Sequence, residues 1–199
     1  VKLTEQILNK IGNMKNGKFI YLSTGAVYGQ KLSSPPATEN TSIKPTNFYG
    51  KTKAKAEQII IKKFKYNKKN NKYYILRLPN VYGASQKKGV IYSFKKQIYK
   101  KNKIYIGGNG NQLRDFLHIN DLIKAIDLAI KKNISSDIFN ISSDLSLSVN
   151  QIANILSKKN TRIKHTKNHN KLEKLVLSYS KAKRRIGYTP NINKLKLTR

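Results

Sequence analysis

Two residues of this chain have the types and the spacing for acid–base chemistry. Tyr49 and Lys53 are four residues apart at the start of a segment with helical periodicity, so they project from one face of the expected helix. A lysine ammonium beside a phenol favours the phenolate, which can accept a proton as a general base. Tyr-x-x-x-Lys arises by chance in many helices, and by itself it is also typical of a solvated helix face.

A hydroxyl group is expected to lie beside this pair. Residues 18–23 form a short apolar run that is typical of a buried strand, and Thr24 follows it, 25 residues before Tyr49. Ligands of parallel α/β sheets bind at the carboxyl ends of the strands. Thr24 therefore belongs to the same predicted site as Tyr49.

Periodicity predicts the elements that must position these residues. A helix over residues 48–66 separates the strand at 18–23 from a second apolar strand at 73–78. Strand, helix and strand in this order predict a parallel pair with a crossover helix, and hence an α/β sheet covered on both faces. Further helices are expected over 3–14, 90–101, 119–131 and, after an N-cap at Ser148, to 156; short strands are expected at 104–106 and 138–141. The chain beyond Asn160 is mainly polar.

Four stretches along the chain are similar to the extended short-chain dehydrogenase/reductase family, which includes the nucleotide-sugar 4-epimerases. They are Leu22-Ser23-Thr24-Gly25-Ala26-Val27-Tyr28-Gly29, then Tyr49-x-x-x-Lys53, then Leu76-Arg77-Leu78-Pro79-Asn80-Val81-Tyr82-Gly83, and the segment from Gly107 to Asp121 that contains Arg114. The resemblance extends from Val1 to about Pro190. It implies a partial Rossmann-like, doubly wound parallel sheet with a smaller C-terminal substrate-binding part. In the same terms, residues 1–83 and 116–145 belong to the sheet domain, and residues 84–115 and 146–199 belong to the substrate-binding part.

The resemblance also implies roles for individual residues. Thr24, Tyr49 and Lys53 match the catalytic residues; Ser23 and Pro79, with Tyr49 and Lys53, match the contacts of NAD or NADP. Thr24, Asn80 and Arg114 match the contacts of a nucleoside diphosphate sugar, and a planar guanidinium suits a pyrophosphate. No metal is implied.

Three departures from the family pattern narrow the prediction. The Gly-x-x-Gly-x-x-Gly turn that binds the dinucleotide pyrophosphate does not occur in this sequence. Ser178 stands where an Asp is usual. Gly25 and Ala26 stand where 4,6-dehydratases have an Asp-Glu pair, which argues against dehydration.

The leading interpretation is an NAD(P)-dependent 4-epimerase that acts through a transient keto sugar. A reductase of an NDP-4-keto-6-deoxy sugar and an inactive fragment are the alternatives.

The composition leaves open one alternative of another functional class, a basic nucleic-acid-binding domain. Lys and Arg number 41 against 9 Asp and Glu, a formal net charge of +32, which is typical of nucleic-acid binding. However, only 6 of the 41 are Arg, the lysines are scattered, and Asn is also abundant at 22 residues. We therefore interpret the charge as compositional and expect no specific nucleic-acid partner and no membrane association. There is no cysteine. We expect a cytoplasmic enzyme, with the helix of Tyr49 and Lys53 as the interface of a homodimer.

Overall fold

The structure is a computed structural model that describes residues 1–199 except 12–14, 30–31, 33–34, 67–69, 168–173 and 192–199. Its first sheet has the strand order β1-β2-β6, formed by β1 (Lys18–Thr24), β2 (Lys72–Leu78) and β6 (Asp137–Asn140), and all pairs are parallel. Apolar residues fill the centre of β2, whose last five residues are buried, as expected of a strand covered on both faces.

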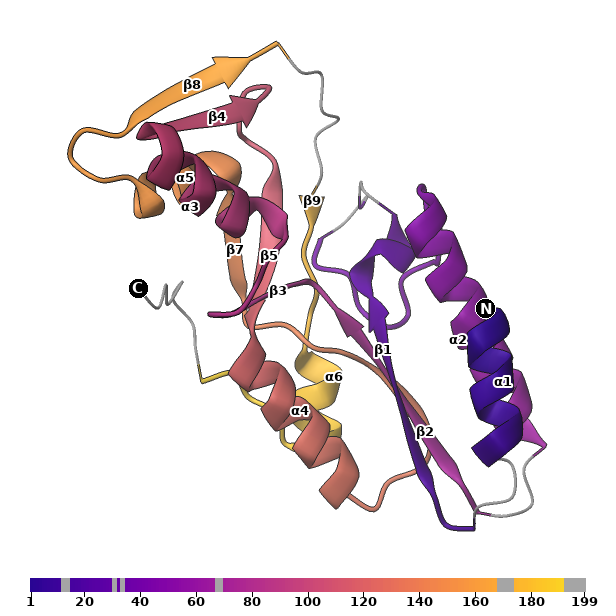
Figure 1. The fold of residues 1–199 in the computed structure, drawn as a ribbon. Helices are drawn as coiled ribbons and strands as arrows, with labels where there is room; N and C mark the ends of the chain where they lie inside the picture. The colour runs from indigo at the N-terminus through magenta and orange to yellow at the C-terminus, as the bar shows by residue number, and fades with distance from the viewer. Residues whose placement is uncertain (12–14, 30–31, 33–34, 67–69, 168–173, 192–199) are drawn as a thin grey trace.

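Helices cover both faces of this sheet (Figure 1). On one face, α1 (Lys2–Ile11) and α2 (Phe48–Lys65) pack through Leu8 and Ile60 onto Ile75. On the other face, α4 (Ile119–Lys131) and α6 (Ser180–Ile186) pack against Tyr74 and Phe139. The prediction of an α/β fold with a parallel β1–β2 pair and α2 as its crossover helix is confirmed.

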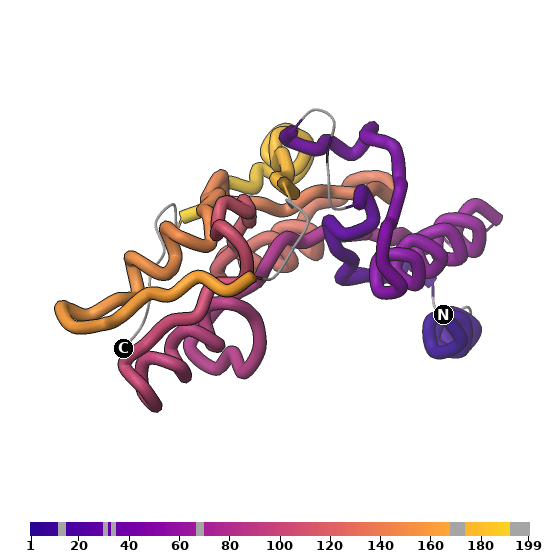
Figure 2. Tube along the Cα trace, turned by 90° about the horizontal axis from the view of Figure 1, so that it is seen from above, coloured from indigo at the N-terminus to yellow at the C-terminus, as the bar shows by residue number. Residues whose placement is uncertain are grey.

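The rest of the chain builds a second part beside the sheet. A mixed sheet contains β3 (Asn80–Tyr82), β5 (Leu113–His118), β7 (Leu145–Ser148) and β9 (Lys174–Leu175), with β5 at its centre. Two further strands, β4 (Lys103–Gly107) and β8 (Arg162–Thr166), pair in parallel, and α3 (Gly89–Lys101) and α5 (Val149–Leu156) pack near them. Seen from above, this part lies at the opposite end of the molecule from α1 and α2 (Figure 2).

The predicted helices and strands agree with the structure within a few residues, and the end of the predicted helix over 3–14 lies outside the described residues. Ser148 caps α5 as predicted, in a capping box with Gln151. Five strands, β3, β5, β7, β8 and β9, and the helix α6 were not predicted. The strand β8 has a polar sequence, Arg-Ile-Lys-His-Thr, so only its pairing with β4 makes it a strand. The described residues beyond Asn160 thus form two short strands and a helix, although their sequence is mainly polar.

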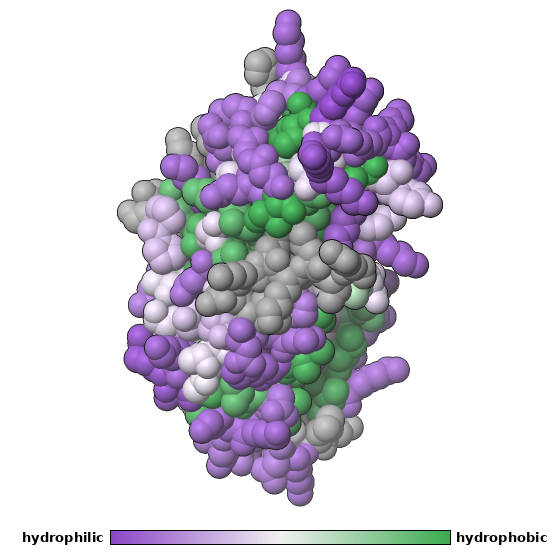
Figure 3. Space-filling model, turned by 90° about the vertical axis from the view of Figure 1, so that its left-hand side faces the viewer, coloured by the Kyte–Doolittle hydropathy of each residue, from purple (hydrophilic) through white to green (hydrophobic). Residues whose placement is uncertain are grey.

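Several large hydrophobic side chains remain on the surface. Ile123 and Ile130 of α4 are 57% and 51% exposed, and Leu22 of β1 is 41% exposed. On the side of the molecule shown in Figure 3, hydrophobic residues reach the surface between hydrophilic ones. Among the described residues, no helix is both long and apolar enough to cross a bilayer.

Candidate active site

A cavity of about 260 Å³ lies where the carboxyl ends of β1 and β2 meet the second part of the molecule. Strand ends, the first turn of α2, β5 and β9 surround it, and Figure 1 shows β9 between β5 and the segment that follows β1. The lining residues are Thr24, Ala26, Gly29, Asn47, Tyr49, Leu78, Pro79, Asn80, Leu113, Arg114 and Leu175. Five of the seven predicted site residues are among them.

Thr24 and Tyr49 reach the cavity from different elements. Thr24 ends β1, and its Oγ1 accepts a hydrogen bond of 3.2 Å from Ala26 N, which caps the short 3₁₀ helix η1 (Gly25–Tyr28). Tyr49 is 54% exposed and lies in the first turn of α2, whose N-cap is Asn47. The Asn47 Oδ1 accepts a hydrogen bond of 2.7 Å from Gly50 N. The cap therefore fixes where Tyr49 enters the site.

Lys53 lies one turn further along α2 and does not line the cavity. Its ammonium donates a 2.8 Å hydrogen bond to Leu22 O and lies 4.7 Å from the centre of the Tyr21 ring. Burial lowers the pKa of Lys53, and the negative charge of Glu57 opposes that effect. In this structure Lys53 thus ties α2 to β1 next to Thr24.

Ser23 also lies outside the cavity lining. Its side chain is 3% exposed and faces α2, where the hydroxyl donates to Glu57. The alternation of side chains along a strand explains the difference from Thr24, which points to the other face of β1. Only the backbone of Ser23 remains for a cofactor, whereas Pro79 lines the cavity.

The predicted substrate contacts lie on the other wall of the cavity. Asn80 begins β3, and its Nδ2 donates a 3.0 Å hydrogen bond to Asp115 O on β5. Arg114 lies on β5 next to Asp115 and is half-buried. The pairing of β3 with β5 therefore brings these two residues together across 34 positions of sequence.

Sequence reasoning missed several residues of this site. Leu175 lies on the two-residue strand β9, whose pairing with β5 is long-range, so no local pattern could have indicated it. Asn47 could have been found, because an Asn before a helical segment is a common N-cap. Among the described residues, no group of three His, Asp or Glu side chains is arranged to hold a metal ion.

A parallel sheet covered on both faces, with Thr24 at a strand end facing the tyrosine of a Tyr-x-x-x-Lys helix, defines a Rossmann-like class of nicotinamide-dependent enzyme. The chain belongs to the NAD dependent epimerase/dehydratase family, whose model matches residues 1–142. This agrees with the resemblance in the sequence.

Two relatives and one solved structure illustrate the similarity. The chain is 34% identical to human dTDP-D-glucose 4,6-dehydratase over 163 residues, which cover 80% of this chain and 44% of the relative. It is 35% identical to a putative UDP-glucose 4-epimerase of Methanocaldococcus jannaschii over 159 residues, which cover 77% of this chain and 50% of the relative. The structure of a UDP-glucuronic acid 4-epimerase mutant of Bacillus cereus with NAD matches with a TM-score of 0.86 and 28% identity, over 96% of this chain and 62% of that chain. The chain thus spans about half the length, or less, of these curated relatives.

Proposed function

We propose that this chain carries the catalytic residues of an NAD(P)-dependent nucleotide-sugar 4-epimerase. The observation that supports it most is the position of Thr24 and Tyr49 on one cavity, opposite Asn80 and Arg114. One wall then offers groups for proton transfer, and the other offers an amide and a guanidinium for a sugar nucleotide.

In the proposed reaction, Tyr49 removes the proton of the sugar C4 hydroxyl, with Thr24 positioning or relaying that proton. Tyr49, Lys53 and Pro79 would hold a nicotinamide, which would supply the reversible two-electron oxidation at C4, and Tyr49 would return the proton to O4 when the keto sugar is reduced on its other face. Lys53 would hold the nicotinamide ribose and favour the ionised form of Tyr49. Arg114 and Asn80 would bind the nucleoside diphosphate, so that the sugar can turn between the two hydride steps.

The cavity fits only the reacting ends of these ligands. At about 260 Å³ it is near the lower end of the range for small-molecule sites. Thr24, Tyr49 and Pro79 can surround a nicotinamide ring, but the Gly-rich turn that would bind the dinucleotide pyrophosphate does not occur in the sequence. We therefore propose that turnover needs a dinucleotide-binding segment in addition to these 199 residues.

The lining of the cavity favours epimerisation over dehydration. None of the residues that line it is an Asp or a Glu, and Gly25 and Ala26 occupy the positions of the dehydratase acid pair. Elimination of water from the sugar requires a group that protonates the leaving hydroxyl. A reductase would use the same Tyr49 and Thr24 and differs from an epimerase in consuming its cofactor.

The test is an assay of the chain with UDP-glucose and with UDP-glucuronic acid in the presence of NAD or NADP, with products identified by NMR. It is made with the chain alone and with the chain co-expressed with the Gly-rich N-terminal half of a family member. We expect epimerisation only from the combined protein, and its loss on Tyr49→Phe. An epimerase turns over repeatedly with catalytic cofactor, whereas a reductase consumes one NADPH for each keto sugar.

Two results would contradict the proposal. Full activity of the chain alone would show that the additional segment is not needed. Calorimetric titrations in which no nucleotide sugar binds more tightly to the wild type than to Arg114→Ala would rule out the assigned substrate class.

A further inference from the structure

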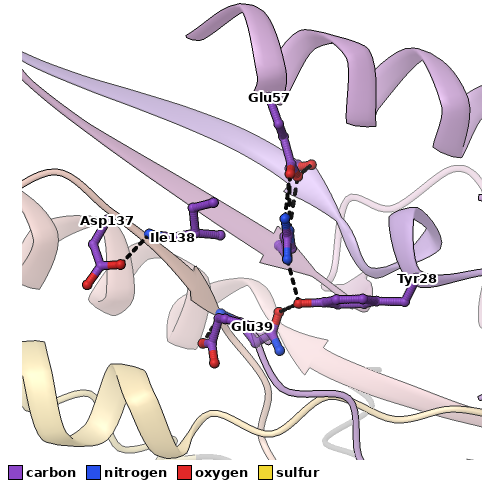
Figure 4. Close-up of polar contacts among 8 residues, drawn as sticks. Tyr28, Glu39, Glu57, Asp137 and Ile138 are labelled. Carbon is purple, nitrogen blue, oxygen red and sulfur yellow. Dashed lines mark hydrogen bonds and ion pairs between the residues drawn. The ribbon is translucent and has the colours of Figure 1, made fainter. Parts of the chain in front are cut away.

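A buried polar network lies next to the candidate active site. Glu57 of α2 and Arg77 of β2 are 1% and 2% exposed, and they form an ion pair with 2.7 Å between Oε2 and Nη2. The Arg77 Nε also donates to both carboxylate oxygens at 3.2 Å. On its other side, Arg77 Nη1 donates a 2.8 Å hydrogen bond to the hydroxyl of Tyr28, which donates in turn to Asn140. Figure 4 shows Glu57 and Tyr28 on opposite sides of the side chain that links them, which is Arg77.

Four members of the network lie in the same elements as residues of the cavity, a few positions away in sequence. Ser23, which donates to Glu57, precedes Thr24, and Arg77 is two residues before Pro79. Tyr28 precedes Gly29, and Glu57 lies two helical turns after Tyr49 on the same helix. The network therefore joins α2, β1, β2 and η1 at the positions from which their active-site residues project.

Stability alone is a weak explanation for this ion pair. Removing two charges from water is costly, and a hydrophobic pair of similar volume is often as stable or more stable. A buried pair does fix geometry, because each partner has few alternatives that satisfy its hydrogen bonds. That suits elements whose side chains must meet at one reacting carbon.

Glu57 also supplies a negative charge close to Lys53. Glu57 follows Lys53 by one helical turn, and the Lys53 ammonium contacts Leu22 O and the Tyr21 ring, both from β1. Arg77 of β2 is the ion-pair partner of the Glu57 carboxylate. Burial lowers the Lys53 pKa, and the negative charge of Glu57 raises it. Glu57 therefore favours the charged form of Lys53.

We propose that Glu57 is a positioning residue for the reaction: with Arg77 it fixes α2 against β1 and β2, and it keeps Lys53 charged at its contact with Leu22. This proposal rests on the proposed function for its catalytic consequence. The effect of Glu57 on the charge of Lys53 concerns the chain alone and can be measured without substrate. The two parts can therefore be tested separately.

The first test is an NMR titration of the Lys53 side chain in the 199-residue chain, without ligand. Glu57→Gln keeps the size of the side chain and removes its charge, so the Lys53 pKa is expected to shift further down. Asp127→Asn is the matched control, because Asp127 is an exposed acid whose partner is Lys131 on the outer side of α4. An unchanged Lys53 pKa in folded Glu57→Gln would overturn the proposal.

A second variant covers the possibility that Glu57→Gln leaves Arg77 buried without a partner and unfolds. Replacing both residues, Glu57→Leu with Arg77→Leu, removes the two charges together and is expected to fold. The Lys53 pKa should again shift down. A folded double variant with the wild-type Lys53 pKa counts against the proposal in the same way.

The catalytic part is measured on the combined protein described under the proposed function. Both variants are expected to lower kcat by about 10- to 100-fold, with little change in KM, because misplacement affects the reacting groups more than the binding groups. They should also displace the pH profile of kcat. Wild-type kcat in a variant with a shifted Lys53 pKa would overturn the positioning role. If Tyr49→Phe is also fully active, the proposed function itself is wrong. The titration of Lys53 still tests the electrostatic effect of Glu57, because it needs no substrate.

Discussion

The carboxylate of Asp115 accepts a 3.1 Å hydrogen bond from the backbone N–H of Leu177, 62 residues further along the chain. The same oxygen accepts from the Ser142 hydroxyl at 2.8 Å, and the side chain is fully buried. This contact holds the segment after β9 against β5, and with it Leu175 at the cavity. Burial raises the pKa of Asp115 to about 7, with the nearby charge of Asp144 adding to the effect.

Asp115 makes stability depend on pH in a defined direction. The folded protein holds this proton more tightly than the unfolded chain, so the free energy of unfolding is expected to fall as pH rises from about 4 to about 7. The rise in pKa corresponds to at most about 4 kcal/mol. Asp115→Asn should flatten this part of the profile, measured by urea unfolding at several pH values. Asp127→Asn, at an exposed site, should leave it as steep as in the wild type, and an equally steep profile in Asp115→Asn would contradict the assignment.

Gly50 allows α2 to approach the segment after β1 closely. A Cβ at this position would lie 2.6 Å from the carbonyl oxygen of Ala26, which is backbone and cannot turn away. Gly50→Ala is expected to destabilise the fold by about 2 to 3 kcal/mol and to displace Tyr49. Gly187→Ala is the control, because a Cβ there meets nothing within 4 Å and adds only the strain of φ +73, about 1 kcal/mol. Equal losses in the two variants, by chemical denaturation, would rule out the close approach as the cause.

Tyr28→Phe tests the hydroxyl that links Arg77 to Asn140. The substitution leaves two buried polar partners without this hydrogen bond, so we expect a loss of about 2 to 4 kcal/mol in the free energy of unfolding. Tyr99→Phe, at a side chain that is 91% exposed, should change stability by less than about 0.5 kcal/mol. Thermal and urea denaturation give both values. A Tyr28→Phe variant as stable as Tyr99→Phe would mean that the network is not held by this hydroxyl.

The net charge of +32 leads to a prediction about nucleic acids. Without a dedicated binding face, DNA and RNA should bind weakly at physiological salt, without sequence preference and with a steep loss of affinity as salt increases. Fluorescence anisotropy with two unrelated oligonucleotides over a salt series measures this. Tight binding to one sequence at physiological salt would mean that the lysines form a recognition surface.

The homodimer through α2 also remains a prediction. Analytical ultracentrifugation of the chain and of a variant with a charge introduced at Phe48, an 81% exposed residue of that helix, would test it. A monomeric wild type would contradict the prediction.

Local patterns were sufficient for much of the fold. The apolar runs at 18–23 and 73–78 and the helical periodicity at 48–66 and 119–131 indicated β1, β2, α2 and α4 because these elements bury a regular face. The motif residues Thr24 and Tyr49 could be assigned to one site for the same reason: strand ends and the following helix lie together in a parallel sheet. The short strands β3, β8 and β9 could not be predicted, because their stability comes from partners far away in the sequence.

The sequence by itself determined the α/β class, the order of the main elements, the family and the residues with the chemistry for proton transfer. The tertiary structure alone decided which of these residues face the cavity and which do not. Ser23 and Thr24 are neighbours in sequence, yet one points to Glu57 and the other to the cavity. The ion pair between Glu57 and Arg77 was likewise decided by the tertiary structure, because no sequence pattern connects these two residues. Side-chain direction and long-range pairing depend on how strands and helices pack, and burial gives such contacts their strength only after packing has excluded water.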